Sequence, residues 1–272
     1  MYVFDLKTII LFIVVVCASI VVFSVLATSL YYRRSRKLAQ TSKMVTEFAR
    51  VNSFLGAFAH EIRTPLTTIL VHLEIARLDQ INPEIRSSSL ELIRKEINRV
   101  NRIIQDISLF NRYQLTTNND HAAIDFLLVI EAAIAQVILQ AEAKNITIEF
   151  DHDEGIHRIM GSADRLEQLF INILDNAVKY CRTGDIIFVK VRQHEKFVQC
   201  IIQDTGTGIA KEHLIHVTEP LYRIRKDIEG SGLGLAIAAE IAKNHQAELA
   251  ISSDQNSEEN GTTVYFAIPI VK

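Results

Sequence analysis

Residues 55–76 read LGAFAHEIRTPLTTILVHLEIA, and the apolar positions in this stretch recur at alternating spacings of four and three residues. The same rhythm runs through residues 90–107. Such heptad spacing is typical of helices that pack in a bundle. We call these positions the apolar seam: Leu55, Ala59, Ile62, Leu66, Ile69, Leu73 and Ala76, followed by Leu90, Ile93, Ile97, Val100, Ile104 and Ile107.

The turn signal DQINPE at residues 79–84 separates the two helices, and Pro83 is suited to open the second one. Two helices with narrow apolar faces cannot bury them well alone. The simplest solution is a four-helix bundle that two copies of residues 53–115 form together. The sequence therefore predicts a homodimer.

Pro65 interrupts the first helix one turn beyond His60. A proline inside a helix removes one backbone hydrogen bond, and here it leaves the carbonyl of Glu61 without its helical donor. We expect the helix to bend beside His60 for that reason. His60 and Thr64 lie one turn apart on the face away from the apolar seam. A lone histidine in such a place is most often a surface residue, so its role depends on the rest of the chain.

Residues 8–32 contain no charged side chain and predict a membrane-spanning helix, because about 20 apolar residues are enough to cross a bilayer. No small-residue cleavage site stands out, which favours a retained helix over a signal peptide. The basic run RRSRK at residues 33–37 places the following part in the cytoplasm by the positive-inside rule. We expect a single-pass protein of the inner membrane, with residues 1–7 outside and residues 33–52 as a juxtamembrane linker.

Charge and cysteine content exclude two classes of function. The net charge of −3 gives no overall basic signal for nucleic acid. Cys17, Cys181 and Cys200 have neither the spacing of a disulfide framework nor that of a metal site.

Beyond a polar linker at residues 116–121, residues 122–272 alternate between helix and strand patterns. Helices are expected over residues 126–145, 163–180 and 232–245. Strands are expected over residues 146–153, 186–193, 196–204, 247–253 and 262–271, the second and third of them as a hairpin. This order predicts an α/β sandwich with helices on one face of a mixed sheet.

The helix expected at residues 163–180 carries a line of amides opposite its apolar stripe. Gln168, Asn172 and Asn176 follow at intervals of four residues, with Lys179 beside them. The line is either a solvated helix face or a ligand site. Amide oxygens one turn apart could hold a hard cation such as Mg²⁺, and Lys179 would add a charge for phosphate.

Two glycine-rich stretches follow. In QDTGTGI, Asp204 ends a strand before Gly206 and Gly208; this is an ordinary turn, or an acceptor for the exocyclic amine of adenine. GSGLGLAIAAE at residues 230–240 opens a helix, as phosphate-binding loops do, although the P-loop pattern is absent. Between them, Arg223, Arg225 and Lys226 form either a basic flap over phosphates or a solvated loop.

In this order and spacing, the motifs resemble those of bacterial two-component sensor histidine kinases. FAHEIRTPL is similar to the H box of the phosphotransfer domain, QLFINILDNAVKY to the N box, DTGTGI to the first G box and GSGLGLAI to the second. The resemblance covers about residues 42–272. It implies that residues 122–272 have the GHKL/Bergerat ATP-binding fold, and that the protein uses ATP and Mg²⁺.

The resemblance also implies residue roles. His60 would accept the γ-phosphate, Glu61 would orient the ring and take its other proton, and Thr64 would position water for dephosphorylating a partner. That partner would be a response regulator, which receives the phosphoryl group on an aspartate. Asn176 and Asn172 would hold Mg²⁺. The other expected ATP-binding residues are Lys179, Tyr180, Asp204, Gly206, Gly208, Arg223, Gly230, Gly232, Leu233 and Gly234.

The sequence departs from the family pattern at two places. Thr218 and Leu221 stand where the F box usually has aromatic residues, and Gln246 and Ala247 replace a frequent glycine pair after His245. The altered F box motivates an alternative function, a phosphatase-biased or weakly active membrane dimer. An ATPase that needs no histidine is a further alternative, but those relatives carry a glutamate base at the position of Asn172, and an amide cannot act as a base.

Overall fold

The computed structural model describes residues 54–78, 80–115, 121–155, 158–225, 228, 230–254 and 260–270. The expected membrane helix at residues 8–32 and the linkers at 33–52 and 116–120 lie outside the described residues. The chain divides into two compact units, Met1–Gly56 and Ala57–Lys272, and the contacts discussed below lie within the second.

Two long helices form the expected hairpin. The first is described over residues 54–76, and we call it the His60 helix; the second is α2 (Pro83–Leu115). The side chain of Asn82 accepts a hydrogen bond from the backbone N–H of Glu84 at 2.8 Å, which explains why α2 begins at Pro83. The predicted turn and the predicted start of α2 are therefore confirmed.

The His60 helix continues through Pro65, which is buried. Threonine hydroxyls around the proline donate to the carbonyls four residues earlier: Thr64 to His60 at 3.3 Å, Thr67 to Arg63 at 2.9 Å and Thr68 to Thr64 at 3.3 Å. None of these three bonds reaches the carbonyl of Glu61, which the proline leaves without its helical donor. Threonine bonds of this kind favour bending of a helix, in line with the bend expected beside His60.

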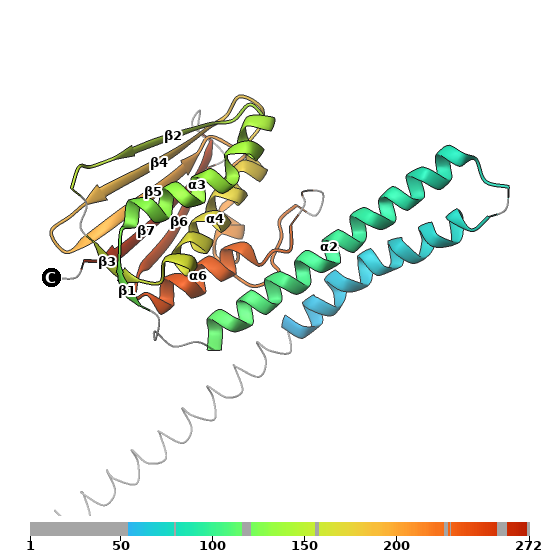
Figure 1. Cartoon of the computed structure of the whole chain (residues 1–272), viewed down its shortest axis with the longest axis horizontal. Coiled ribbons are helices and arrows are strands. Elements are labelled where there is room, and N and C mark those ends of the chain that lie inside the picture. Colours follow the sequence, from blue (N-terminus) through green and yellow to red (C-terminus); the bar gives the residue numbers. More distant parts are fainter. Residues whose placement is uncertain are drawn as a thin grey trace, which may run out of the picture. The chain divides into compact units, whose positions relative to one another are not determined.

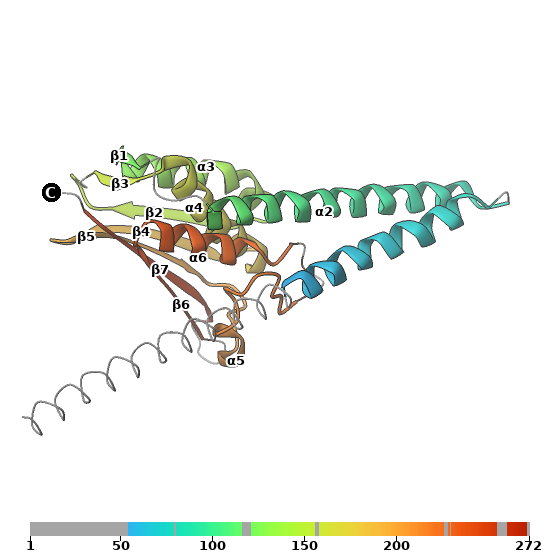
Figure 2. The same ribbon diagram turned by 90° about the horizontal axis from the view of Figure 1, so that it is seen from below.

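A five-stranded mixed sheet forms the centre of the C-terminal part (Figures 1 and 2). Its strands lie in the order β2 (Thr147–His152), β4 (Ile186–Gln193), β5 (Phe197–Asp204), β7 (Gly261–Pro269) and β6 (Glu248–Asp254). The β2–β4 pair is parallel and the other pairs are antiparallel, including the predicted β4–β5 hairpin. The helices α3 (Phe126–Ala143), α4 (Ala163–Tyr180) and α6 (Gly234–Asn244) cover one face, as expected (Figure 2).

Three short elements were not predicted. β1 (Ala122–Ile124) pairs with β3 (Ile159–Gly161), and α5 (Lys211–Leu214) follows β5. Elements of three or four residues are too short to show a periodic pattern, so the sequence carries little signal for them.

The core between the helices and the sheet is built on an aromatic cluster. Phe126, Phe170 and Phe266 are fully buried, and the ring of Phe170 meets those of Phe126 and Phe266 edge-on at centroid distances of 5.6 and 5.3 Å. Phe170 belongs to the apolar stripe of α4, and its burial turns the opposite face of α4, with the amide line, away from the sheet.

Among the described residues, one helix has the length and apolar composition that could span a membrane, by those criteria alone: α3. Six of its residues are buried, including Phe126 and Ile130, in packing against the sheet and α4. An apolar core helix has the same composition, so α3 adds little to the membrane question.

Candidate nucleotide and phosphotransfer site

A cavity of about 830 Å³ lies at the amide line of α4. It is lined by ten of the residues that the sequence nominated for ATP: Asn172, Asn176, Lys179, Tyr180, Asp204, Gly208, Arg223, Gly230, Gly232 and Gly234. Gly206 and Leu233 do not line it; Leu233 is fully buried. The structure therefore brings predicted ATP-binding residues from four separate segments of the chain together around one cavity.

Two members of the amide line, Gln168 and Asn172, are hydrogen-bonded to each other. Gln168 donates to the side-chain oxygen of Asn172 at 3.2 Å. The side-chain nitrogen of Asn172 is buried and has no protein partner within the described part of the chain. A buried amide nitrogen without a partner is costly, so the protein alone does not satisfy the Asn172 side chain. Together with Asn176 it offers the neutral oxygen ligands that suit Mg²⁺, so these residues fit the ion.

Lys179 forms an ion pair with Asp175 at 2.5 Å, one turn earlier on α4. Both side chains are partly exposed. A side chain built on Gly230 would meet the ammonium group of Lys179 at 3.8 Å, so this charge lies beside the glycine loop. The lysine is therefore near the position that a phosphate would take, although Asp175 holds it in this state.

Asp204 is 8% exposed at the end of β5, and its burial raises the pKa of the carboxyl group to about 6. One carboxyl oxygen, Oδ1, accepts from the backbone N–H groups of Gly206 at 3.0 Å and Thr262 at 3.2 Å. These bonds oppose the effect of burial. A Cβ on Gly206 would lie 2.8 Å from the carbonyl oxygen of Tyr180, so only glycine permits this turn. With Oδ1 engaged, Oδ2 is the oxygen available to a ligand.

Residues 215–225, which follow α5 and which we call the lid, pack on the second glycine loop. Leu221 is buried with φ 66°, a conformation that is strained for a branched side chain, and its N–H donates to the carbonyl of Gly232 at 2.9 Å. Gly232 has φ 75°, and a Cβ there would lie 2.9 Å from backbone atoms of Leu221 and Tyr222. Leu221 is one of the two residues that depart from the F-box pattern.

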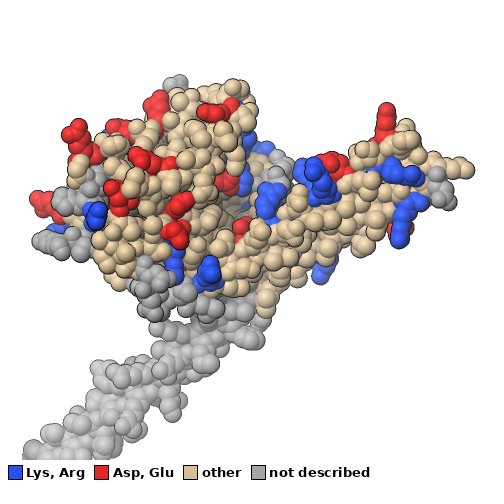
Figure 3. Space-filling view, viewed as in Figure 1, with Lys and Arg blue, Asp and Glu red and all other residues tan. Residues whose placement is uncertain are grey.

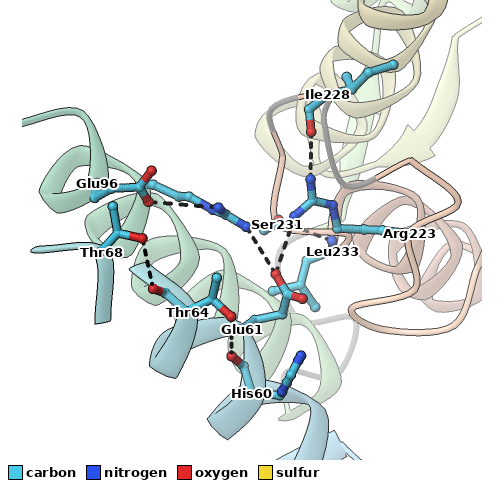
Figure 4. Close-up of polar contacts among 10 residues, drawn as sticks. His60, Glu61, Thr64, Thr68, Glu96, Arg223, Ile228, Ser231 and Leu233 are labelled. Carbon is cyan, nitrogen blue, oxygen red and sulfur yellow. Dashed lines mark hydrogen bonds and ion pairs between the residues drawn. The ribbon is translucent and has the colours of Figure 1, made fainter. Parts of the chain in front are cut away.

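Arg223 reaches from the lid to the His60 helix (Figure 4). Its guanidinium lies 3.3 Å from the carboxylate of Glu61 and donates to the carbonyl of Ile228 at 2.6 Å. Arg99 of α2 lies 3.3 Å from the same oxygen of Glu61. The side chains of Glu61 and Arg223 are 13% and 7% exposed, so this ion pair is largely withdrawn from water. His60, the neighbour of Glu61, is exposed.

Sequence reasoning missed the contribution of α2 to the cavity. Arg99, Arg102 and Asp106 line it beside the residues of α4. In the space-filling view, basic and acidic side chains both border the hollow where α2 meets the sheet-bearing part (Figure 3). Asp106 accepts a hydrogen bond from the hydroxyl of Ser231 at 2.5 Å, and burial raises the pKa of its carboxyl group.

Two family models match the chain. The His Kinase A (phospho-acceptor) domain matches residues 50–115, and the histidine kinase-, DNA gyrase B-, and HSP90-like ATPase domain matches residues 161–272. The sensor histidine kinase RppB of Synechocystis is 29% identical over 213 residues, 76% of this chain and 47% of the relative. The phosphate regulon sensor protein PhoR of Pseudomonas aeruginosa is 31% identical over 209 residues, 74% of this chain and 46% of the relative.

The chain belongs to the two-component sensor histidine kinases. It spans about half the length of the curated relatives it matches. Among solved structures, the histidine kinase ThkA in complex with the response regulator protein TrrA is 21% identical, with a TM-score of 0.63 over 78% of this chain and 60% of that one. That likeness supports the kinase fold for both the helical hairpin and the ATP-binding part.

Proposed function

We propose that this histidine kinase transfers the γ-phosphoryl group of ATP to His60 and passes it on to an aspartate of a response regulator. The observation that supports the proposal most directly is the reach of Arg223. One lid residue lines the nucleotide cavity and also contacts Glu61, which is next to His60. Arg223 therefore places the lid, and with it the cavity, beside the turn of helix that carries His60, the expected acceptor.

Nucleotide binding follows from the lining of the cavity. The free oxygen of Asp204 would accept the exocyclic amine of adenine, whereas guanine has a carbonyl at that position and would be rejected. Asn172 and Asn176 would hold Mg²⁺, which neutralises phosphate charge when it is bound. Lys179, Arg223 and the N–H groups at the start of α6 would hold the phosphates.

In the transfer step, a ring nitrogen of His60 forms the new N–P bond while the bond to the β-γ bridging oxygen breaks and ADP leaves. The other ring nitrogen carries the proton that must then leave, and we propose that Glu61, the next residue, accepts it once its contact with Arg223 is released. Exposure of His60 suits both partners, since the ring must meet the ATP site first and the regulator afterwards.

A second copy of the chain is the proposed partner of the apolar seam. Large seam residues are exposed in the single chain: Leu66 at 46%, Leu73 at 39%, Leu90 at 52%, Ile97 at 46% and Ile104 at 50%. An apolar face that spans two helices is a liability in a monomer. Pairing of two hairpins into a four-helix bundle would cover it.

Attachment to the inner membrane through residues 8–32 is proposed from the sequence, with the catalytic part in the cytoplasm. The uncharged span and the basic residues behind it support this placement. Residues 53–115 and 122–272 are then proposed as the phosphotransfer and catalytic domains.

A phosphatase-biased dimer is the second candidate, and the lid favours it. Leu221 takes a strained conformation where the family has an aromatic residue, which would weaken the lid movement that autophosphorylation needs. Dephosphorylation of a regulator would rely on Thr64 instead. Nucleotide binding without any phosphohistidine would favour this candidate.

The test is labelling of the full chain in detergent micelles with γ-labelled ATP and Mg²⁺. We expect label on the wild type and on His72→Gln, and none on His60→Gln. His72 is a suitable control because it is a second histidine on the same helix. Its ring nitrogen Nδ1 lies 3.4 Å from the hydroxyl of Ser89 on α2. Label on His60→Gln equal to that on the wild type would refute the proposed acceptor.

A further inference from the structure

A second apolar line on α2 faces the catalytic part rather than the apolar seam. Ile103, Phe110 and Tyr113 are 1%, 4% and 6% exposed, and α2 contacts α6 along this line. The side-chain amide of Asn244 on α6 donates to the carbonyl of Tyr113 at 2.6 Å. Ile103, Asp106, Phe110 and Tyr113 follow one another at intervals of three, four and three residues. Asp106 is therefore a single carboxylate within the otherwise apolar face of α2 that contacts α6.

Asp106 is aimed at the second glycine loop. The hydroxyl of Ser231 donates to Asp106 at 2.5 Å and accepts from the N–H of Leu233 at 3.1 Å. Ser231 is 8% exposed. The loop that opens α6, where phosphates would bind, is thus tied to the helical hairpin by an acidic side chain.

Glu61 makes the equivalent contact with the lid. Its carboxylate points to the guanidinium of Arg223, at 3.3 Å (Figure 4). The same carboxylate lies 3.3 Å from Arg99. Arg99 comes from the hairpin itself, so it keeps Glu61 in place whether or not the lid is present. Arg223 comes from the lid, so its contact with Glu61 is the one that a different acceptor, such as a phosphate, can replace.

The two contacts have the same chemistry. In each, a carboxylate of the hairpin accepts hydrogen bonds from a donor that borders the nucleotide cavity, and both donors belong to segments that pack together through Leu221 and Gly232. Carboxylate and phosphate oxygens are interchangeable acceptors for guanidinium and hydroxyl groups. A phosphate that takes these donors must displace the carboxylates.

We propose that Asp106 and Glu61 occupy the places of nucleotide phosphates on Ser231 and Arg223, so that docking of the catalytic part on its hairpin and binding of ATP compete. The inference rests on the proposed function. Because coupling between two binding events is reciprocal, ATP weakens the docked state as much as docking weakens ATP binding. Capture of Arg223 by phosphate also leaves Glu61 with Arg99 alone, next to His60.

The opposite interpretation is that Asp106 supports the loop in the form that binds nucleotide. The two interpretations predict opposite signs for the loss of Asp106. Removal of a competitor tightens nucleotide binding, whereas removal of a support weakens it.

The experiment measures the dissociation constant of a non-hydrolysable ATP analogue with Mg²⁺ on the full chain in detergent micelles. We expect Asp106→Ala to bind the analogue about tenfold more tightly than the wild type, a change of ~1.4 kcal/mol. Glu91→Ala is the matched control, since it removes an acidic residue of the same helix that pairs on the surface with Arg94. Its affinity should equal that of the wild type.

A double variant guards against an indirect effect. In a Ser231→Ala background the hydroxyl is gone, so Asp106→Ala should change affinity by less than about threefold if the carboxylate acts through Ser231. Unchanged or weaker binding by Asp106→Ala in the folded protein overturns the competition, as does a full tenfold effect without Ser231. His60 labelling of the wild type is measured in parallel. Normal labelling with no tightening refutes only this inference, while absence of nucleotide binding to the wild type refutes the proposed function as well.

Discussion

Replacement of Asp204 by asparagine should make the nucleotide-free protein more stable while destroying its nucleotide site. Burial raises the pKa of Asp204 from 3.8 to about 6, so the ionised form destabilises the fold at neutral pH. Asparagine has the same shape and keeps an oxygen for the N–H groups of Gly206 and Thr262. The asparagine amide nitrogen would stand where Oδ2 is now. This nitrogen and the exocyclic amine of adenine are both hydrogen-bond donors, so they could not bond to each other.

The sign of the pH dependence follows from the raised pKa. Between pH 3.8 and about 6 the folded protein binds more protons at Asp204 than the unfolded chain does, so the stability that this group contributes is lost as pH rises through that window. The two pKa values imply that the loss between about pH 4.5 and pH 8 amounts to roughly 2 kcal/mol. The stability advantage of Asp204→Asn over the wild type should grow by that amount across the same range.

The assay is urea unfolding of both proteins at the two pH values, with ATP-analogue binding measured at pH 8. Buried His245 titrates with the opposite sign, because its pKa is lowered to about 4, but it is present in both proteins and cancels in the difference. Glu149→Gln, which replaces an exposed carboxylate on β2 by an amide, is the control for the change in net charge. A difference between Asp204→Asn and the wild type that does not change with pH would refute the reasoning, as would undiminished nucleotide binding.

Three further predictions concern the seam, the end of α6 and the threonine near His60. Ile97→Glu should convert a dimer into monomers in light scattering, whereas Leu128→Glu on α3, also well exposed, should not; an intact Ile97→Glu dimer would contradict the bundle. Gln246 ends α6 with φ 53°, so Gln246→Gly should raise the free energy of unfolding by about 1 kcal/mol, and a decrease would rule out strain there. Thr64→Ala should lose regulator dephosphorylation and keep His60 labelling, unlike Thr67→Ala, which should keep both activities; equal loss in the two variants would refute a specific role for Thr64.

The sequence predicted those features that a local pattern encodes. The helical period of α4 placed its apolar stripe inward and so turned Asn172 and Asn176 toward the cavity. Alternation predicted the β4–β5 hairpin, and Pro83 predicted the start of α2. Glycine at 206 and 232 indicated turns that only glycine permits, and the structure gives the atoms responsible.

The contacts between the hairpin and the catalytic part were not predictable in the same way. Asp106 meets Ser231 across 125 residues of sequence, and Glu61 meets Arg223 across 162. No local period links such positions. A signal was nevertheless present in α2: Ile103, Phe110 and Tyr113 form a second apolar line outside the apolar seam. An α2 helix with two apolar faces, the apolar seam and this second line, would have indicated a second packing surface that includes Asp106.

The position of the transferred phosphoryl group tests the proposed kinase most directly. After reaction of the full chain with γ-labelled ATP and Mg²⁺, trypsin would release residues 51–63, a peptide with His60 as its sole histidine. We predict one phosphoryl group on His60 in this peptide, stable to alkali and lost in acid, and no phosphoryl group on His72 in residues 64–77. Label on any other residue, with residues 51–63 unmodified, would contradict the transfer to His60.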